Sequence, residues 1–206
     1  GLTSVDSRKW HISIERSSFI HVSKLNIKAP KDSPSTDGIR IEHSTNVILA
    51  SSIIKTVLEV LVKKEEKRVE YVTITRANFY TTENGVRIKT WQGGHGYARH
   101  IRFERLLFSR VTRPIIIDQY SCSPHQHCNN HSTAVEISNI LYNDLRGTTN
   151  SEIAVEISCS ESVPCKNIRM KDIQLNYGIN DEIYYGHPKS HCSNVVQSWD
   201  EGNVNP

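Results

Sequence analysis

The feature that most constrains the fold is a repeat of short β-branched segments separated by polar turns. Such segments occur about twice in each unit, as in "DGIRIEHSTNVILASSIIKT" and "VEYVTITRANFYTTENGVRIKT". Units of roughly 20–30 residues that show strand periodicity and no long helical face are typical of a solenoid. In a solenoid of strands, each coil places Val, Ile and Leu inward against its neighbours. We therefore predict an all-β chain, folded as a right-handed parallel β-helix.

A β-sandwich is the alternative, but it requires hairpin turns such as Asn-Gly between paired strands. The chain offers this signal only in "ENG", before Val86, so the sandwich ranks lower. The predicted β-helix covers 1–178. Within it, the segment 57–68 ("VLEVLVKKEEKR") is predicted to be a short helix or an irregular link, and 179–206 is predicted to be a polar tail without repeats.

Composition excludes several classes of protein. The 206 residues are enough for one domain with a core, and 37% hydrophobic with 23% charged residues describes a globular chain rather than a disordered one. No apolar run is long enough to cross a bilayer, so we expect no membrane partner. The net charge of +3 is not concentrated in a basic cluster, so we expect no nucleic-acid partner.

The five cysteines fall into two pairs and one remainder. Cys122 and Cys128 bracket one short polar loop, and Cys159 and Cys165 bracket another. This spacing favours two local disulfides and hence an oxidising compartment. A metal site that uses the histidines near the first pair is the alternative. Cys192 is left without a predicted partner in this chain.

Two further observations bear on secretion. Asn130 begins "NHS", a single N-glycosylation sequon. The N-terminal "GLTSVDSRKW" has no apolar signal-peptide core, so either the protein is not secreted or the chain begins downstream of its start.

The segment "NGVRIKTWQGG" alternates apolar and charged residues. In a strand, successive side chains point to opposite faces, so Val86 and Ile88 would point inward while Arg87 and Lys89 point outward together. Two adjacent cations could hold an anionic group. The same alternation also describes any half-buried strand, and spacing alone does not separate the two interpretations.

Four motifs occur in a fixed order: "SPSTDGIRI", "NGVRIKTWQGG", "PIIIDQYSC" and "CSESVPC". Together they resemble the plant polygalacturonases of glycoside hydrolase family 28, over nearly the whole chain from about Ser7. The resemblance implies a single-stranded, pectin-lyase-like right-handed parallel β-helix that is secreted to the plant cell wall. It implies inverting hydrolysis of α-1,4-galacturonosyl linkages in pectin or polygalacturonate by a monomer, without metal or cofactor. It also implies a further Cys beyond this chain as the partner of Cys192.

The family's catalytic pattern is N-T-D, G-D-D, G-H-G and R-I-K. An inverting hydrolase needs one carboxylic acid for the leaving oxygen and a carboxylate that activates water. By the resemblance, Asp37 is the water-activating base, although Ser35 replaces the usual Asn. Arg87 and Lys89 match R-I-K and would bind the substrate's carboxylates. Tyr120 would line the substrate site.

The G-D-D and G-H-G motifs are absent after Thr56, where the family would continue with G-D-D. His95 lies in a Gly-His-Gly sequence that follows R-I-K, so its order is wrong and the catalytic role is not transferred. Rescue of activity would need Glu42, Asp118 or His95 to take the place of the missing acid. We therefore predict a polygalacturonase-family chain with little or no catalysis. The alternatives are a non-catalytic pectate-binding protein and a fragment without an independent role.

Overall fold

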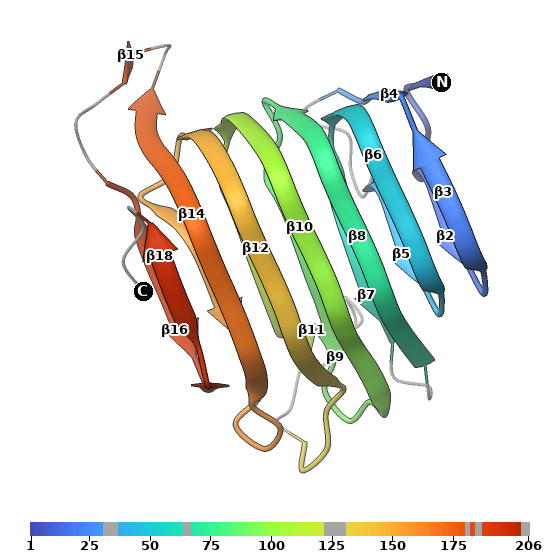
Figure 1. Cartoon of the computed structure of the whole chain (residues 1–206), viewed down its shortest axis with the longest axis vertical. Coiled ribbons are helices and arrows are strands. Elements are labelled where there is room, and N and C mark those ends of the chain that lie inside the picture. Colours follow the sequence, from blue (N-terminus) through green and yellow to red (C-terminus); the bar gives the residue numbers. More distant parts are fainter. Residues whose placement is uncertain (31–36, 64–66, 122–130, 180–181, 184–186, 203–206) are drawn as a thin grey trace.

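The computed structural model describes residues 1–30, 37–63, 67–121, 131–179, 182–183 and 187–202. Every regular element in this part of the chain is a β-strand, and nearly all strand pairs are parallel. The strands wind into the predicted right-handed parallel β-helix, with successive coils side by side from the N-terminal to the C-terminal end (Figure 1).

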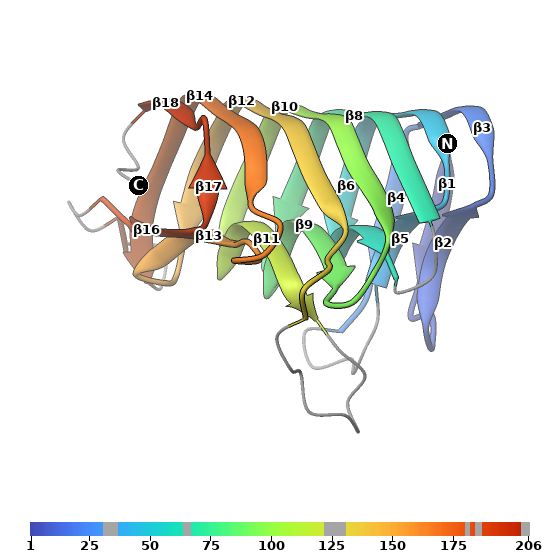
Figure 2. The ribbon, with the colours of Figure 1, turned by 90° about the horizontal axis from the view of Figure 1, so that it is seen from below.

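Two sheets form the walls of the solenoid (Figure 2). The wide sheet, which faces the viewer in Figure 1, contains β1 (Leu2–Val5), β3 (Ser18–Ser23), β4 (Leu25–Lys28), β6 (Thr45–Lys55), β8 (Lys67–Tyr80), β10 (Gly96–Val111), β12 (Glu136–Thr149), β14 (Cys165–Ile179), β15 (Glu182–Ile183), β17 (Val195–Val196) and β18 (Trp199–Gly202). The second sheet, behind it, contains β2 (Trp10–Glu15), β5 (Asp37–Glu42), β7 (Val57–Val62), β9 (Asn84–Trp91), β11 (Arg113–Ser121), β13 (Ile153–Ser158) and β16 (Lys189–Ser193). The chain alternates between the two sheets, so each coil contributes a strand to both.

Inward side chains of each coil lie directly against those of the next coil. In the second sheet, one such row of Cα partners consists of Ile41, Val60, Ile88, Ile117 and Ile157, all buried. Full burial of one such aliphatic side chain contributes about 1.5–3 kcal/mol. The repeated β-branched residues of the sequence therefore form one continuous core, as the solenoid prediction requires.

The wide sheet stacks larger side chains in the same way. Phe103 pairs with Tyr142 on the next strand, and their rings lie 5.0 Å apart and nearly parallel. Phe79 and Phe108 form a second stacked pair, with 5.3 Å between ring centroids. Gly147 lies beside Phe108, where a Cβ atom would come within 1.8 Å of the Phe108 carbonyl oxygen. Glycine is required there for two reasons: a Cβ atom would clash with this oxygen, and a φ of +137° disfavours any other residue.

The strands of the wide sheet bend at two rows of residues with left-handed backbone conformation. The register places the first row at equivalent positions of successive coils: Phe19, Asn46, Tyr71, His100, Asn139, Asn167 and Gln197. The second row lies five residues further along: Lys24, Ser51, Arg76, Arg105, Asp144 and Asp172. Asn, Asp and His are the non-glycine residues that adopt this conformation most readily, whereas bulky residues are outliers.

Two segments differ from the sequence predictions. The region 57–68 was predicted to be a short helix or an irregular link, but residues 57–62 form β7, which pairs with both β5 and β9. The region 179–206 was predicted to be a tail without repeats. Its described residues instead form strands, of which β16 extends the second sheet and β17 and β18 extend the wide sheet. Both segments form strands because their backbones pair with strands of a neighbouring coil.

Within the described residues, no helix has the length and apolar character needed to cross a membrane.

A substitution of Phe19 can measure the free-energy cost of the left-handed conformation at the bends. The Phe19 side chain is 83% exposed, so replacement by Asn loses little burial, and Asn adopts φ near 57° more easily. We expect Phe19→Asn to raise the free energy of unfolding by about 1 kcal/mol. The melting temperature would rise by about 2–4 °C in calorimetry. Ser18→Asn, on the exposed neighbour in extended conformation, should give no increase; a lower melting temperature for Phe19→Asn would contradict the assignment of strain.

Candidate functional site

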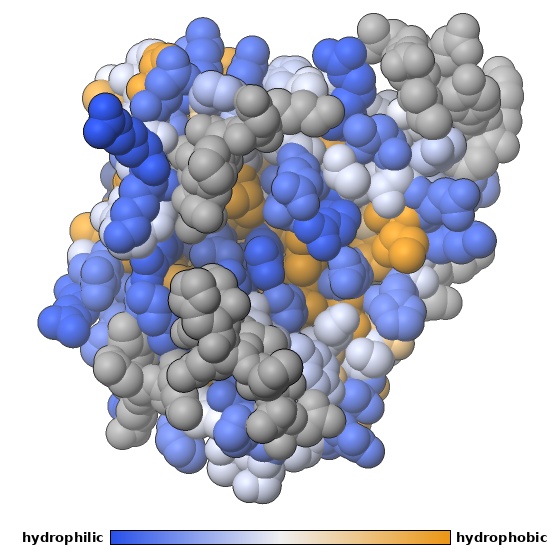
Figure 3. Space-filling model, turned by 180° about the vertical axis from the view of Figure 1, so that it is seen from behind, coloured by the Kyte–Doolittle hydropathy of each residue, from blue (hydrophilic) through white to orange (hydrophobic). Residues whose placement is uncertain are grey.

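The candidate residues lie on the outer face of the second sheet, where β5, β7, β9 and β11 run side by side. On β9, Val86 and Ile88 are fully buried, while Arg87 and Lys89 are partly exposed. The two cations therefore point away from the core together, as the alternation in the sequence predicted. In the space-filling view of this side, hydrophilic side chains gather between the grey segments (Figure 3).

The strand register places charged residues in two rows across this face. In the first row, Glu59 of β7 lies between Arg40 of β5 and Arg87 of β9. In the second row, Lys89 of β9 pairs with Asp118 of β11. Opposite charges thus alternate between neighbouring strands, an arrangement that favours cross-strand pairing.

Arg87 is held by carboxylates on both sides. Its Nη2 donates a hydrogen bond of 2.7 Å to Asp118 Oδ2. Its Nε lies 3.9 Å from Glu59 Oε1, which is an ion pair but too long for a hydrogen bond. The Arg87 side chain is 23% exposed, so it is partly accessible from outside while its orientation is fixed.

Asp118 organises this part of the site. Besides Arg87, it accepts hydrogen bonds from the Ser121 hydroxyl at 2.6 Å and from the Tyr120 backbone N–H at 3.0 Å. A carboxylate with three such donors is well suited to fix the direction of a neighbouring cation.

Lys89 and Tyr120 complete the predicted substrate-binding set. The ammonium of Lys89 lies 5.2 Å from the centroid of the Trp91 ring, within the range of a cation–π contact. Tyr120 lines a small pocket of about 210 Å³, and its hydroxyl accepts a hydrogen bond of 3.2 Å from the Glu161 backbone N–H. Arg87 and Lys89 thus lie on the strand next to Asp118, whereas the Tyr120 side chain faces the 159–165 loop.

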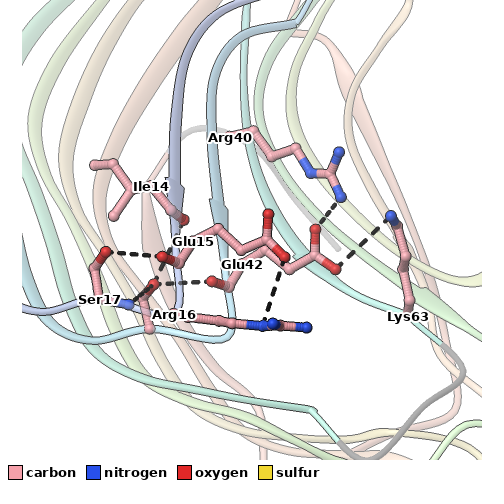
Figure 4. A network of polar contacts seen from close by, with 8 residues as sticks. Ile14, Glu15, Arg16, Ser17, Arg40, Glu42 and Lys63 are labelled. Atoms are coloured by element: carbon pink, nitrogen blue, oxygen red, sulfur yellow. Dashed lines mark hydrogen bonds and ion pairs between the residues drawn. The ribbon is translucent and has the colours of Figure 1, made fainter.

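At the other end of the face, Glu42 is almost fully buried and faces two cations (Figure 4). The Arg40 guanidinium donates a hydrogen bond to it, and the Lys63 ammonium lies 3.8 Å away. Arg40 also lies over the Trp10 ring, 4.6 Å from its centroid. The described carboxylates of this face, Glu42, Glu59 and Asp118, thus each contact a cation.

Gln119 lies between Asp118 and Tyr120, but its side chain points inward. It connects β11 to Val135 and to the loop that contains Ser160. Its side-chain N–H donates to the Val135 carbonyl at 2.7 Å, and its side-chain oxygen accepts from the Ser160 N–H at 2.8 Å. That loop is closed by the disulfide between Cys159 and Cys165, with Cα atoms 5.7 Å apart. This predicted disulfide is confirmed.

Several predicted residues fall outside the description. Asp37 begins β5 and pairs with Val57, but its side chain is not among the described ones. Cys122, Cys128 and Asn130 also lie outside the described residues, so their predicted roles stay predictions. His95 is exposed in the connection between β9 and β10.

Sequence analysis did not single out Glu59 or Arg40 as site residues. Glu59 carries the only charge in "VLEVLV", and a carboxylate within an apolar strand rarely stays buried without a partner. This isolated charge is the sequence feature that indicates a paired carboxylate at this position. The identity of its partner, Arg87, required the register of β7 against β9.

Comparisons with known proteins show the family of this chain. The model of the family described as glycosyl hydrolases family 28 matches residues 1–57 and 60–200. The chain is 32% identical to polygalacturonase QRT2 of Arabidopsis thaliana, over 98% of this chain and 51% of that protein. It is 34% identical to a polygalacturonase of Persea americana, over 95% of this chain and 47% of that protein. The chain thus spans about half the length of these relatives.

A solved structure shows the same fold. The polygalacturonase from Erwinia carotovora ssp. carotovora superposes with a TM-score of 0.66 at 20% identity, over 94% of this chain and 55% of that one. The two residues that the family model leaves out, 58 and 59, lie in β7.

The buried contacts of Gln119 give a stability test of this architecture. Gln119→Met fills a similar space but leaves the Val135 carbonyl and the Ser160 N–H without their partner, and each such loss costs about 1–3 kcal/mol. We expect the free energy of unfolding to fall by about 2 kcal/mol in denaturant titrations. Gln174→Met, at an exposed position of β14, is the matched control and should change little. Equal stability of the two variants would contradict the assigned role.

Proposed function

Because the chain belongs to glycosyl hydrolases family 28, we propose that it binds polygalacturonate on the face formed by β5, β7, β9 and β11 and hydrolyses its α-1,4-galacturonosyl linkages only weakly. The observation that carries the proposal is the pair of outward cations, Arg87 and Lys89, on one strand of this face.

Binding follows from the chemistry of these two cations. A guanidinium presents two parallel N–H groups to a carboxylate, whereas an ammonium acts as a point charge. Galacturonate carries one carboxylate on each sugar, so neighbouring cations suit a chain of such units. Asp118 restrains Arg87 in its direction, which reduces the entropy lost when a ligand binds. Tyr120 would contact the sugar beside them.

Catalysis by an inverting mechanism needs two carboxyl groups with different roles. Asp37, at the start of β5, is proposed to activate water. A general acid must carry a proton, and the described carboxylates of this face each contact a cation instead. Glu42, Glu59 and Asp118 are therefore assigned to holding Arg40, Arg87 and Lys63. Loss of a general acid typically lowers the rate ~10²–10⁴-fold, which supports weak hydrolysis.

The cellular setting is part of the proposal. The Cys159–Cys165 disulfide suits an oxidising compartment, in line with secretion to the cell wall. We propose a monomer that acts without metal or cofactor, on pectin or polygalacturonate. A pectate-binding protein without any catalysis is the second candidate, and it is favoured by the ion pairs of the described carboxylates.

Reducing-sugar release from polygalacturonic acid tests the catalytic part. We expect the purified chain to release sugar at least about 10²-fold more slowly than an intact polygalacturonase of the family. Asp37→Asn should abolish the remaining activity, whereas Glu152→Gln, at an exposed position outside the site, should leave it unchanged. A rate equal to that of the intact enzyme would show that another residue supplies the acid. Complete inactivity of a cooperatively folding chain would favour the pectate-binding candidate.

Affinity electrophoresis in polygalacturonate tests the binding part. We expect Lys89→Ala to weaken binding roughly tenfold, because it removes one charge-assisted contact. The loss should shrink as salt rises, since salt screens exposed charges. Lys28→Ala removes an equal charge from an exposed position at the end of β4 and serves as the control. Unchanged binding by Lys89→Ala would count against this face as the binding site.

A further inference from the structure

The outer face of the wide sheet carries a groove that the proposed function does not use. It has a volume of about 840 Å³ and receives side chains from β3, β6, β8, β10, β12 and β14, the strands in front in Figure 1. The groove follows the first row of left-handed residues, where every strand bends: Phe19, Asn46, Tyr71, His100, Asn139 and Asn167. Because the bend recurs in each coil, the groove runs across the strands, along the solenoid axis.

Exposed rings and apolar side chains line part of this groove. Phe19 is 83% exposed and Tyr71 is 50% exposed, although both occupy a backbone conformation that bulky residues rarely adopt. The Tyr71 ring stacks on His100, with 5.0 Å between centroids and 5° between planes. Ile48, between them and Phe19 in strand order, is also exposed. Clustered exposed apolar groups of this kind mark binding surfaces rather than solvated ones.

The charge of the groove is one-sided. Among the described residues that line it, none is acidic, whereas Arg102 and Arg169 are both present. They lie on β10 and β14, two strand spacings apart, or roughly 10 Å. Arg102 donates hydrogen bonds to Glu104 from both Nε and Nη2, and 56% of its side chain stays exposed, so its remaining N–H groups face the groove's solvent side. Arg169 donates through its Nε to the Asn167 side chain at 2.9 Å, which fixes its direction.

Two amide side chains, Asn139 of β12 and Asn167 of β14, lie in the row next to the arginines. The Asn167 side chain donates a hydrogen bond of 2.6 Å to the Asn139 side-chain oxygen, so the two amides form a short ladder along the groove. Amides offer both donors and acceptors, and guanidinium groups match carboxylates. A neighbouring hollow of about 500 Å³ is lined in part by Arg76, Arg105 and Arg146, and by Asp144, which pairs with Arg146. Its net charge is therefore still positive.

We propose that this groove binds a linear acidic polysaccharide, with its carboxylates on Arg102 and Arg169 and its sugar rings against Tyr71 and Phe19. A row that repeats once per coil suits a ligand that repeats along its own length, and the absence of acidic lining residues in the described structure suits a polyanion. The groove lies on the opposite wall from Arg87 and Lys89, so the chain would have two faces for the same class of polymer. The proposal rests on the proposed function only in the choice of ligand class.

Binding of polygalacturonate to the purified chain, followed by affinity electrophoresis at several salt concentrations, tests the groove. We expect the double variant Arg102→Gln/Arg169→Gln to bind roughly tenfold more weakly than the unchanged chain. The control Lys28→Gln/Lys55→Gln removes the same charge from paired exposed positions at the far end of the same sheet. It should change binding less than twofold.

A second variant tests the rings without disturbing the fold. Tyr71→Asn places a residue that favours φ near 55° at the bend, so the chain should fold at least as well while losing the ring contact. We expect it to weaken binding about threefold, with no fall in melting temperature. Binding of a neutral galactan as tightly as polygalacturonate would overturn the acidic character of the ligand.

The outcomes separate this proposal from the proposed function. Equal losses in the arginine variant and its lysine control would mean that only net charge matters, and the groove would be excluded. A loss with Lys89→Ala but none with the arginine variant would also exclude it, and would leave the face of β9 as the binding site. A loss with the arginine variant alone would support the groove and contradict that face. Dimers that dissociate in the Tyr71→Asn variant would assign the groove to a second copy of this chain and overturn the proposal.

Discussion

The contact of each coil with its two neighbours is the interaction on which the whole structure depends. Rows such as Ile41, Val60, Ile88, Ile117 and Ile157 exclude water only because each strand is in register with the next. A slip of one residue would turn such a row outward and place Arg87 and Lys89 in the core. The position of the functional side chains is therefore a direct result of packing on the opposite side of the same strands.

This dependence explains how β7 is accommodated. Residues 58 and 59 of this strand fall outside the match to the family model, yet its apolar residues continue the core rows between β5 and β9. On the outward side of the same strand, Glu59 faces Arg40 and Arg87. The hydrophobic requirement of a coil is thus independent of the residues on its outer side, so the fold can stay the same while the outward residues differ.

Much of this could be predicted from the sequence, and the failures have physical reasons. Strand periodicity predicted the β-helix, and the spacing of Cys159 and Cys165 predicted their disulfide, which the structure confirms. The segment 57–62 was misjudged because a short apolar run fits a strand or a helix equally well until its neighbours are known. The strands after Ile179 pair through their backbones, which leaves little trace in side-chain type. The partners of Asp118 lie on β9 and within its own strand, and only the register brings Arg87 to it.

The two bends of the wide sheet have a consequence for how such a chain changes over evolutionary time. Because the backbone itself turns at these positions, the side chains there stay outside the core and contact mainly one another, and Phe19, Tyr71, His100 and Asn139 occupy equivalent places. Substitutions can therefore accumulate there one coil at a time while the interior stays the same. The residues of such a row can be replaced one at a time, so that this face could come to bind other polymers while the fold stays the same.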